Sequence, residues 1–348
     1  MVKTHAESQR RGEHIDTSLA EGDSKNLRSS ASPREAKTIF DSGKAIPAVH
    51  INGYLMDAPN IFIGSHAKPL CDVPVMRIGS QPIDDGNYLF NEEEMVAFIN
   101  KEPKSEKYFH PWYGSEEFIN GKKRWCLWLG NCTQGELFAM PECLKRVQAV
   151  RSFRLASKRA QTLKAAETPA HFGSEVIAES NYMVVPKVSS ERRRYVPIGF
   201  FTPETFCSDL VFIIPDATLY HFGVLTSSVH MAWMRAVAGR LKSDYRYSAN
   251  IVYNNFPWPG LCDSAPMFEE ISQTAQAILD AREKHADCTF AQMYGEKMYL
   301  FSDLVVAHAA NDRAVLAAYG LKPDTPEPEI VAHLFKLYAE KTKGSPAQ

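Results

Sequence analysis

The sequence has no long apolar run. Nowhere among its 348 residues do about 20 consecutive apolar residues occur, which is the length that a helix needs to cross a bilayer. The N-terminal segment MVKTHAESQRRGEHIDTS also lacks the apolar core of a secretory signal peptide. These two absences predict a cytoplasmic protein that has no membrane partner.

The cysteines lack the spacing of a disulfide framework or a metal site. There are seven of them, an odd number, with no C-x-x-C pair and no Cys/His cluster at zinc spacing. They occupy positions 71, 126, 132, 143, 207, 262 and 288. We therefore expect free thiols in a reducing compartment and no bound metal.

Familiar catalytic motifs are missing as well. The sequence contains no G-x-S-x-G elbow, no Walker loop, no G-x-G-x-x-G fingerprint and no H-E-x-x-H pair. His110, His221 and His230 are scattered and are more typical of core or surface histidines than of ligands. The sequence therefore predicts no catalytic residue within this chain.

The whole chain also has little net charge, because 39 basic residues face 41 acidic ones and leave a formal charge of -2. This average hides two blocks of opposite sign. Residues 145–260 contain 15 basic and 8 acidic residues, a net +7, whereas residues 261–348 contain 8 basic and 13 acidic residues, a net -5. A basic block of this kind favours an anionic partner, and an acidic one favours packing on protein.

Element patterns predict an α+β fold, with a mixed sheet-and-helix domain followed by a small all-helical C-terminal domain. Strands are expected at 122–129, 182–188, 192–200 and 209–215, and helices at 141–167, 227–241, 267–285, 302–319 and 327–342. A further helix is expected to begin at Asn91, which precedes three acidic residues. We expect residues 1–36 to be a disordered tail, residues 37–260 to form the first domain and residues 261–348 the second.

The predicted helix at 141–167 is strongly basic. Seven basic residues and no acidic one lie between Lys145 and Lys164. Arg151, Arg154 and Lys158 follow helical spacing and are expected to share one face. Unpaired like charges at such spacing repel one another, so this face favours contact with nucleic-acid phosphates, with Lys145 as a further contact. The alternative is an ordinary solvated surface.

The segment KVSSERRRY, at 187–195, combines cations with small hydroxyl groups next to predicted strands. In an extended chain, Arg192 and Arg194 would point to one face and Arg193 to the other. Guanidinium groups suit both phosphates and guanine edges, so we expect Ser190, Arg192 and Arg194 to approach DNA bases. Lys187 is expected to contact a phosphate. The alternative is an exposed strand whose charges are neutralised by salt bridges.

A second candidate set follows in GRLKSDYRYS, at 239–248. If this segment is extended, Lys242, Asp244 and Arg246 lie on the same face because they alternate along the chain. A lysine donates to guanine O6 or N7 while an aspartate accepts from the N4 amine of cytosine, so together they would read one G·C pair. The alternative is an ordinary surface ion pair.

Eight ordered segments carry a family resemblance. They are INGYLMDAPN, KPLCDVPVM, DDGNYL, GKKRWCLWL, RVQAVRSFRLASKR, PKVSSERRRYVPIGF, ATLYHFGVLTSSVHMAWMRAV and GRLKSDYRYSANIVYNNFPWP. Through them the chain, from Lys37 to Tyr338, resembles the C-terminal half of MmeI-like DNA adenine methyltransferases, the fused type II restriction and modification enzymes. The resemblance implies a target recognition domain and a small helical C-terminal domain. It also implies that the segment matching Lys242 to Arg246 chooses bases.

The chain departs from this family at the catalytic end. The family's Asn-Pro-Pro-Tyr/Phe motif and its glycine-rich cofactor motif have no counterpart, and in the segment Asn254 to Pro257 the proline follows the aromatic residue instead of preceding it. The resemblance thus implies the DNA recognition part of an adenine-N6 methyltransferase. Double-stranded DNA and a methyltransferase domain or subunit would be its partners, and S-adenosylmethionine would bind to that partner and not to this chain. A stand-alone enzyme with an unrecognised site and an inactive fragment remain the alternatives.

Overall fold

The computed structural model describes residues 37–41, 44–48, 61–260 and 265–342 of the chain. Its strands are β1 (Lys37–Asp41), β2 (Lys44–Ala48), β3 (Arg77–Ile78), β4 (Leu89–Phe90), β5 (Phe109–Tyr113), β6 (Trp125–Leu127), β7 (Tyr182–Pro186), β8 (Val188–Ser189), β9 (Gly199–Phe201), β10 (Phe206–Cys207), β11 (Val211–Pro215), β12 (Gly239–Leu241) and β13 (Asp244–Arg246). Its helices are α1 (Glu92–Lys101), α2 (Ser115–Asn120), α3 (Gln134–Phe138), α4 (Pro141–Leu155), α5 (Ala160–Ala165), α6 (Leu219–Leu225), α7 (Ser228–Val237), α8 (Pro266–Glu283), α9 (Phe290–Met293), α10 (Ser302–Ala318) and α11 (Glu327–Thr342). The tail prediction for residues 1–36 lies outside the described residues.

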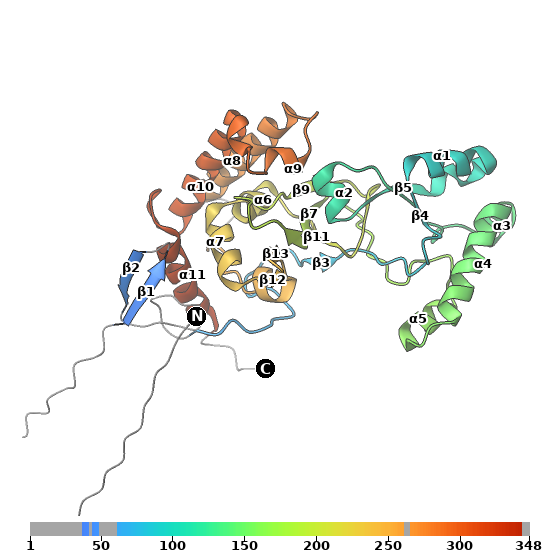
Figure 1. Cartoon of the computed structure of the whole chain (residues 1–348), viewed down its shortest axis with the longest axis horizontal. Helices are drawn as coiled ribbons and strands as arrows, with labels where there is room; N and C mark the ends of the chain where they lie inside the picture. Colours follow the sequence, from blue (N-terminus) through green and yellow to red (C-terminus); the bar gives the residue numbers. More distant parts are fainter. Residues whose placement is uncertain (1–36, 42–43, 49–60, 261–264, 343–348) are drawn as a thin grey trace, which may run out of the picture.

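The elements spread along one long axis, with α1 and α3 to α5 at one end and α8, α10 and α11 at the other (Figure 1). Between them lies a four-stranded sheet in the order β3-β11-β7-β9, in which every neighbouring pair is antiparallel. All five residues of β7 and the first four of β11 are buried, so both faces of this sheet are covered. The strand expected at 209–215 is confirmed, and it begins at Val211.

The end that contains α4 is built around a second four-stranded sheet, in the order β10-β5-β6-β4. Its core gathers Tyr88, Trp112 and Leu127 against the inner face of α4, from which Cys143 and Val150 are fully buried. Helix α1 begins after Asn91, whose side chain accepts a hydrogen bond from the backbone of Glu94 in a capping box. The predicted helix start at this residue is therefore confirmed.

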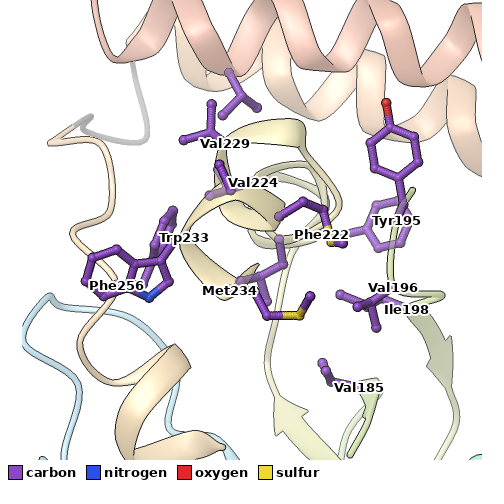
Figure 2. Packing of buried hydrophobic residues seen from close by; sticks show 14 of the residues in the cluster. Val185, Tyr195, Val196, Ile198, Phe222, Val224, Val229, Trp233, Met234 and Phe256 are labelled. Carbon is purple, nitrogen blue, oxygen red and sulfur yellow. The ribbon is translucent and has the colours of Figure 1, made fainter. Parts of the chain in front are cut away.

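The C-terminal helices share one hydrophobic core with the central sheet. Figure 2 shows part of this core, where Val185 of β7, Phe222 of α6 and Trp233 of α7 lie together. Leu334 of α11 belongs to the same cluster. A Cβ atom on Gly223 would lie 2.7 Å from Ile271 and 2.9 Å from Asn311, so glycine at this position allows α6 to pack closely on α8 and α10.

This arrangement confirms the predicted fold class, because a region of mixed sheets and helices precedes a helical C-terminal part. The three predicted C-terminal helices correspond to α8, α10 and α11, and their ends agree within two residues. Among the described residues, no helix is both long enough and apolar enough to span a membrane.

Three predicted elements differ from the structure. The single helix expected at 141–167 is two helices, because the chain leaves α4 at Ala156 and the Ser157 hydroxyl accepts a hydrogen bond from the Arg159 amide, which competes with helical bonding. The helix expected at 227–241 ends at Val237, and the residues after it pair as strand β12. The strand expected at 192–200 is a turn followed by β9, which begins only at Gly199.

Candidate nucleic-acid interface

A small three-stranded sheet brings the two segments of predicted base-reading residues together. Its order is β12-β13-β8, and both pairs are antiparallel. Tyr245 lies opposite Ser189, and Arg246 lies opposite Val188. Since Ser190 directly follows β8, the loop at 190–194 emerges from this sheet beside the hairpin formed by β12 and β13. Residues more than 50 positions apart in sequence thus border one surface.

The hairpin differs from the extended segment that alternation predicted. Lys242 has a φ angle of +57° and forms, with Ser243, the two-residue turn between β12 and β13. This left-handed backbone matches the strand twist at a tight hairpin and breaks the alternation at Lys242. Asp244 and Arg246 do share one face of β13, while Tyr245 between them is buried on the other. The prediction that all three side chains lie on one extended line is therefore wrong for Lys242.

The charged side chains of the hairpin do not neutralise one another. Within the described part of the chain, no ion pair within 4.0 Å involves Lys242, Asp244 or Arg246. Among the described residues, the single hydrogen bond that the Asp244 carboxylate accepts is a long one, from the backbone amide of Glu191 at 3.4 Å. The alternative interpretation, in which Lys242 and Asp244 form a surface ion pair, is not what the structure has.

Lys187 lies between β7 and β8 at the edge of the same surface. Its Nζ atom is 5.2 Å from the centroid of the Phe212 ring, and its side chain is half-buried. Burial lowers the pKa of this lysine; the charge of Asp209 opposes the shift, and that of Arg246 adds to it. An anion placed beside Lys187 and Arg246 would relieve this repulsion.

Arg192 and Arg194 point instead toward the C-terminal helices. An Arg192 Nη1 lies 3.0 Å from an oxygen of Glu296, and an Arg194 Nη2 lies 3.8 Å from an oxygen of Asp312. Both guanidinium groups remain largely exposed. Of the two interpretations of this segment, the geometry matches the one in which its arginines form ion pairs within the protein.

Arg154 is the clearest correction to the sequence-based site. Its side chain is completely buried, and its five N–H groups donate to backbone carbonyls. These acceptors are the carbonyl oxygens of Pro82, Ile83, Ala165, Thr168 and His171, at 2.7 to 3.3 Å. A residue with no exposed surface and no free donor cannot hold a phosphate, so the predicted DNA contact of Arg154 is wrong.

Helices α4 and α5 and the segment between them form an arm of the molecule, and the other predicted phosphate contacts on this arm remain on the surface. Lys145 is exposed but forms an ion pair with Glu142 at 2.7 Å. Arg151 lies on the outer face of α4, and Lys158 lies in the segment between α4 and α5, so the two do not share one helix face as predicted. Neither takes part in an ion pair within the part of the chain that the structure describes, and both are exposed.

The sequence analysis did not single out Arg240, and it named Arg193 without giving it a role. The Arg240 guanidinium lies 3.9 Å from the centroid of the Tyr245 ring and donates to the carbonyl oxygen of Ser243 at 2.9 Å, so it braces the hairpin turn. Arg193 is partly buried and lies 3.5 Å from the Ser189 hydroxyl. The signal that locates Arg240 is Gly239, which ends the helical pattern and begins a hairpin.

The described residues contain no group of three or more His, Cys, Asp or Glu side chains that could hold a metal ion. The residues at the surface of the β12-β13-β8 sheet instead include cationic hydrogen-bond donors, Lys242 and Arg246, and an anionic acceptor, Asp244. Such a set suits the recognition of polar edges and phosphates better than bond-making chemistry.

Two family models match consecutive parts of this chain. Residues 57–260 match the family model "MmeI, target recognition domain", and residues 266–345 match "MmeI, C-terminal domain". The central sheet and the hairpin surface lie within the first match, and α8, α10 and α11 lie within the second.

Two longer proteins are similar to this chain. DNA methyltransferase A of Bacillus subtilis (strain 168) is 40% identical over 294 residues, which are 84% of this chain and 33% of that protein. The solved structure of the Type IIL restriction-modification enzyme MmeI in complex with DNA is 39% identical, with a TM-score of 0.82 over 89% of this chain and 42% of that one. The chain thus spans less than half the length of either protein.

Proposed function

The chain belongs to the family of the MmeI target recognition and C-terminal domains, and from this premise we propose that it recognises a specific sequence in double-stranded DNA. We further propose that it does so as part of an S-adenosylmethionine-dependent adenine-N6 methyltransferase of a restriction-modification system. Support comes from the similarity to DNA methyltransferase A and to the MmeI enzyme that was solved with DNA.

The observation that carries this proposal is that three charged residues of the β12-β13 hairpin have no ion-pair partner among the described residues. Lys242, Asp244 and Arg246 are presented on one small sheet, and no ion pair among the described residues involves them. Cationic donors and an anionic acceptor on one hairpin, with Lys242 in its turn and Asp244 and Arg246 on one face of β13, suit the edges of base pairs in a major groove. Lys242 would donate to guanine and Asp244 would accept from cytosine, while Ser190 and Arg246 would approach neighbouring positions.

Contacts with phosphates would hold the protein on the duplex without choosing a sequence. Lys187 is placed for such a contact because it lies at the edge of the hairpin surface, where a nearby anion would compensate Arg246 as well. Arg151 and Lys158 would add contacts from the arm of α4 and α5, which lies toward one end of the long axis (Figure 1). Lys145, already paired with Glu142, would contribute less.

Methyl transfer would require a domain or subunit beyond this chain. The chain corresponds to 33% of DNA methyltransferase A, so most of that protein has no counterpart here. The missing part would bind S-adenosylmethionine and would hold an adenine that is flipped out of the duplex. This chain would then bind no cofactor and would deliver the target sequence to that pocket.

A selection from a random duplex library tests the recognition step. The purified chain should enrich one motif, and Asp244→Ala should relax the motif at one base pair, equivalent to about 1–3 kcal/mol of discrimination. Arg151→Ala is the matched control, because loss of a phosphate contact should weaken all sequences alike. If the chain enriched no motif, or if both variants weakened binding uniformly, the base-reading assignment would fail.

A methyl-transfer assay tests the division of roles. The chain is incubated with labelled S-adenosylmethionine and DNA that carries the enriched motif, with and without a methyltransferase domain of the same family. We expect label in adenine only when that domain is present. Transfer by the chain alone would contradict the proposal and would favour a stand-alone enzyme.

A further inference from the structure

The carboxylate of Asp312, on helix α10, lies against two separate parts of the recognition domain. Only about a tenth of its side chain is exposed. One oxygen accepts a hydrogen bond from the Tyr195 hydroxyl at 2.6 Å, and the other accepts one from the Ser228 backbone N–H at 2.7 Å. A buried carboxylate held by two short hydrogen bonds has little freedom to move.

The first contact fixes one end of the loop at 190–194. Tyr195 directly follows this loop, is buried, and stacks its ring on His308 of α10 at a centroid distance of 4.1 Å and an angle of 17°. The other end of the loop is fixed by β8, which pairs with β13 of the hairpin. The path of the loop is therefore set on one side by the hairpin sheet and on the other by α10.

The second contact fixes the helix that leads to the hairpin. Ser228 is the first residue of α7, and β12 begins at Gly239, two residues after the end of that helix. The first N–H groups of a helix have no partner within it, and the helix dipole favours an anion at this end. Asp312 satisfies one of these groups and so anchors the start of the element on which the hairpin is mounted.

Neighbouring contacts between the C-terminal helices and the recognition domain do not combine these two functions. Arg282 donates to the carbonyl oxygen of Ile198 at 2.5 Å, and Asn311 donates to that of Gly223 at 2.8 Å. Glu296 reaches Arg192, and Glu327 reaches Arg235 on α7. Among the described residues of the C-terminal helices, Asp312 alone forms hydrogen bonds both to the end of the loop and to α7.

We propose that Asp312 is a positioning residue for DNA recognition, which sets the loop at 190–194 relative to the hairpin at 239–246. This inference rests on the proposed function. Groups that read bases must be held within about 0.5 Å of their working geometry by residues behind them. The C-terminal helices would thus tune sequence discrimination from the far side of the recognition surface, without contacting the bases themselves.

The experiment compares the wild-type chain with Asp312→Ala and Asp312→Asn by selection from a random duplex library. Asp312→Ala removes both hydrogen bonds and the ion pair with Arg194 at 3.8 Å, so we expect it still to bind DNA but to lose on the order of tenfold in discrimination at one or more motif positions. Asp312→Asn should retain the motif. Its carbonyl oxygen still accepts from Ser228, and its amide donates to the Tyr195 oxygen.

Asn311→Ala is the matched control, because Asn311 is the adjacent residue, is also buried, and contacts α6 and α8 instead of the loop. It should lower the melting temperature and leave the motif intact. If Asp312→Ala does not melt cooperatively, Tyr195→Phe removes one of the two hydrogen bonds more gently and should broaden the motif in the same way.

Three outcomes separate this inference from the proposed function. A wild-type chain that enriches no motif overturns the proposed function itself. A wild-type motif that persists in a folded Asp312→Ala or Tyr195→Phe variant overturns only the positioning role of Asp312. Equal broadening in Asn311→Ala also overturns that role, because the effect would then follow from a general loss of stability.

Discussion

The arm of α4 and α5 and the hairpin of β12 and β13 are both basic in sequence, but they use their charges differently. On the arm, Arg154 donates all its hydrogen bonds to five backbone carbonyls, and Lys145 forms an ion pair with Glu142. On the hairpin, Lys242 and Arg246 form no ion pair with any described residue. A count of charges does not distinguish the two cases, because backbone carbonyls can satisfy all five N–H donors of a buried arginine and no acidic residue is then needed beside it.

Position along the helix explains why Arg154 turns inward. Cys143, Val147, Val150 and Arg154 are the buried residues of α4, and they follow one another at spacings of four, three and four. This is the period of a single helix face, so Arg154 continues the stripe that packs on the core. Arg151, three residues before it, falls on the outer face instead.

Replacement of Arg154 should produce the largest loss of stability. It tests whether the charge of this arm residue is used inside the protein and not for a ligand. Arg154→Ala leaves several buried carbonyls without a donor, including that of Ile83, whose backbone has a strained φ of +49°. We expect the free energy of unfolding to fall by about 3–5 kcal/mol. Chemical denaturation measures this loss. A change under about 1 kcal/mol would contradict the buried role of Arg154 and would favour the predicted phosphate contact instead.

The second-largest expected effect is a loss of folding stability in acid, caused by a histidine on the helix that precedes the hairpin. Helix α7 carries His230, whose ring bonds the Tyr247 hydroxyl at 2.9 Å, and complete burial lowers its pKa from 6.5 to about 3. Below about pH 6.5 the unfolded chain binds a proton that the folded chain excludes, so stability falls with pH at about 1.4 kcal/mol per unit. At about pH 5 the loss is about 2 kcal/mol from this residue.

Denaturation of wild type and His230→Gln at several pH values measures this slope. Glutamine does not titrate in this range, so the variant should have a shallower pH dependence even though it is less stable at neutral pH. Parallel slopes for the two proteins would show that His230 is not the group responsible.

Removal of a surface charge on the arm should have a smaller effect. It should change the affinity for DNA and leave folding stability almost unchanged. Arg151→Ala and Lys158→Ala should each change the free energy of unfolding by less than about 0.5 kcal/mol. If both side chains contact phosphates, each variant should lower the slope of log affinity against log salt by about 1. An unchanged slope in both would leave the hairpin surface as the site of DNA binding and the arm as an ordinary solvated surface.

The smallest expected effect separates the shape of the hairpin from its chemistry. Lys242 holds a left-handed backbone with a φ of +57°, which glycine adopts without strain. Lys242→Gly should therefore change stability by less than about 0.5 kcal/mol, because relief of the strained backbone offsets the added freedom of the unfolded chain, while it removes the donor proposed to read guanine. Loss of discrimination without loss of stability would support the assignment, and an intact motif would contradict it.

Local signals were sufficient for much of the fold. The apolar run at 211–215, the cap at Asn91 and the three C-terminal helices were predictable because each depends on residues close together in sequence. The predicted helix before the hairpin runs four residues past the end of α7, because the prediction used the local apolar pattern alone. Val237 and Leu241 continue its apolar stripe, although Leu241 is 52% exposed on β12 and has no core to join.

The family and the fold class could be determined from the sequence alone, because ordered motifs and local periodicity carry both. Which of the positive charges are available to a ligand depends on the folded structure. Arg154 meets acceptors that lie 11 to 72 residues away in sequence, and Arg194 meets Asp312 on another element altogether. The partner of a charged side chain depends on burial and on the direction of distant groups, and these exist only once the chain has folded.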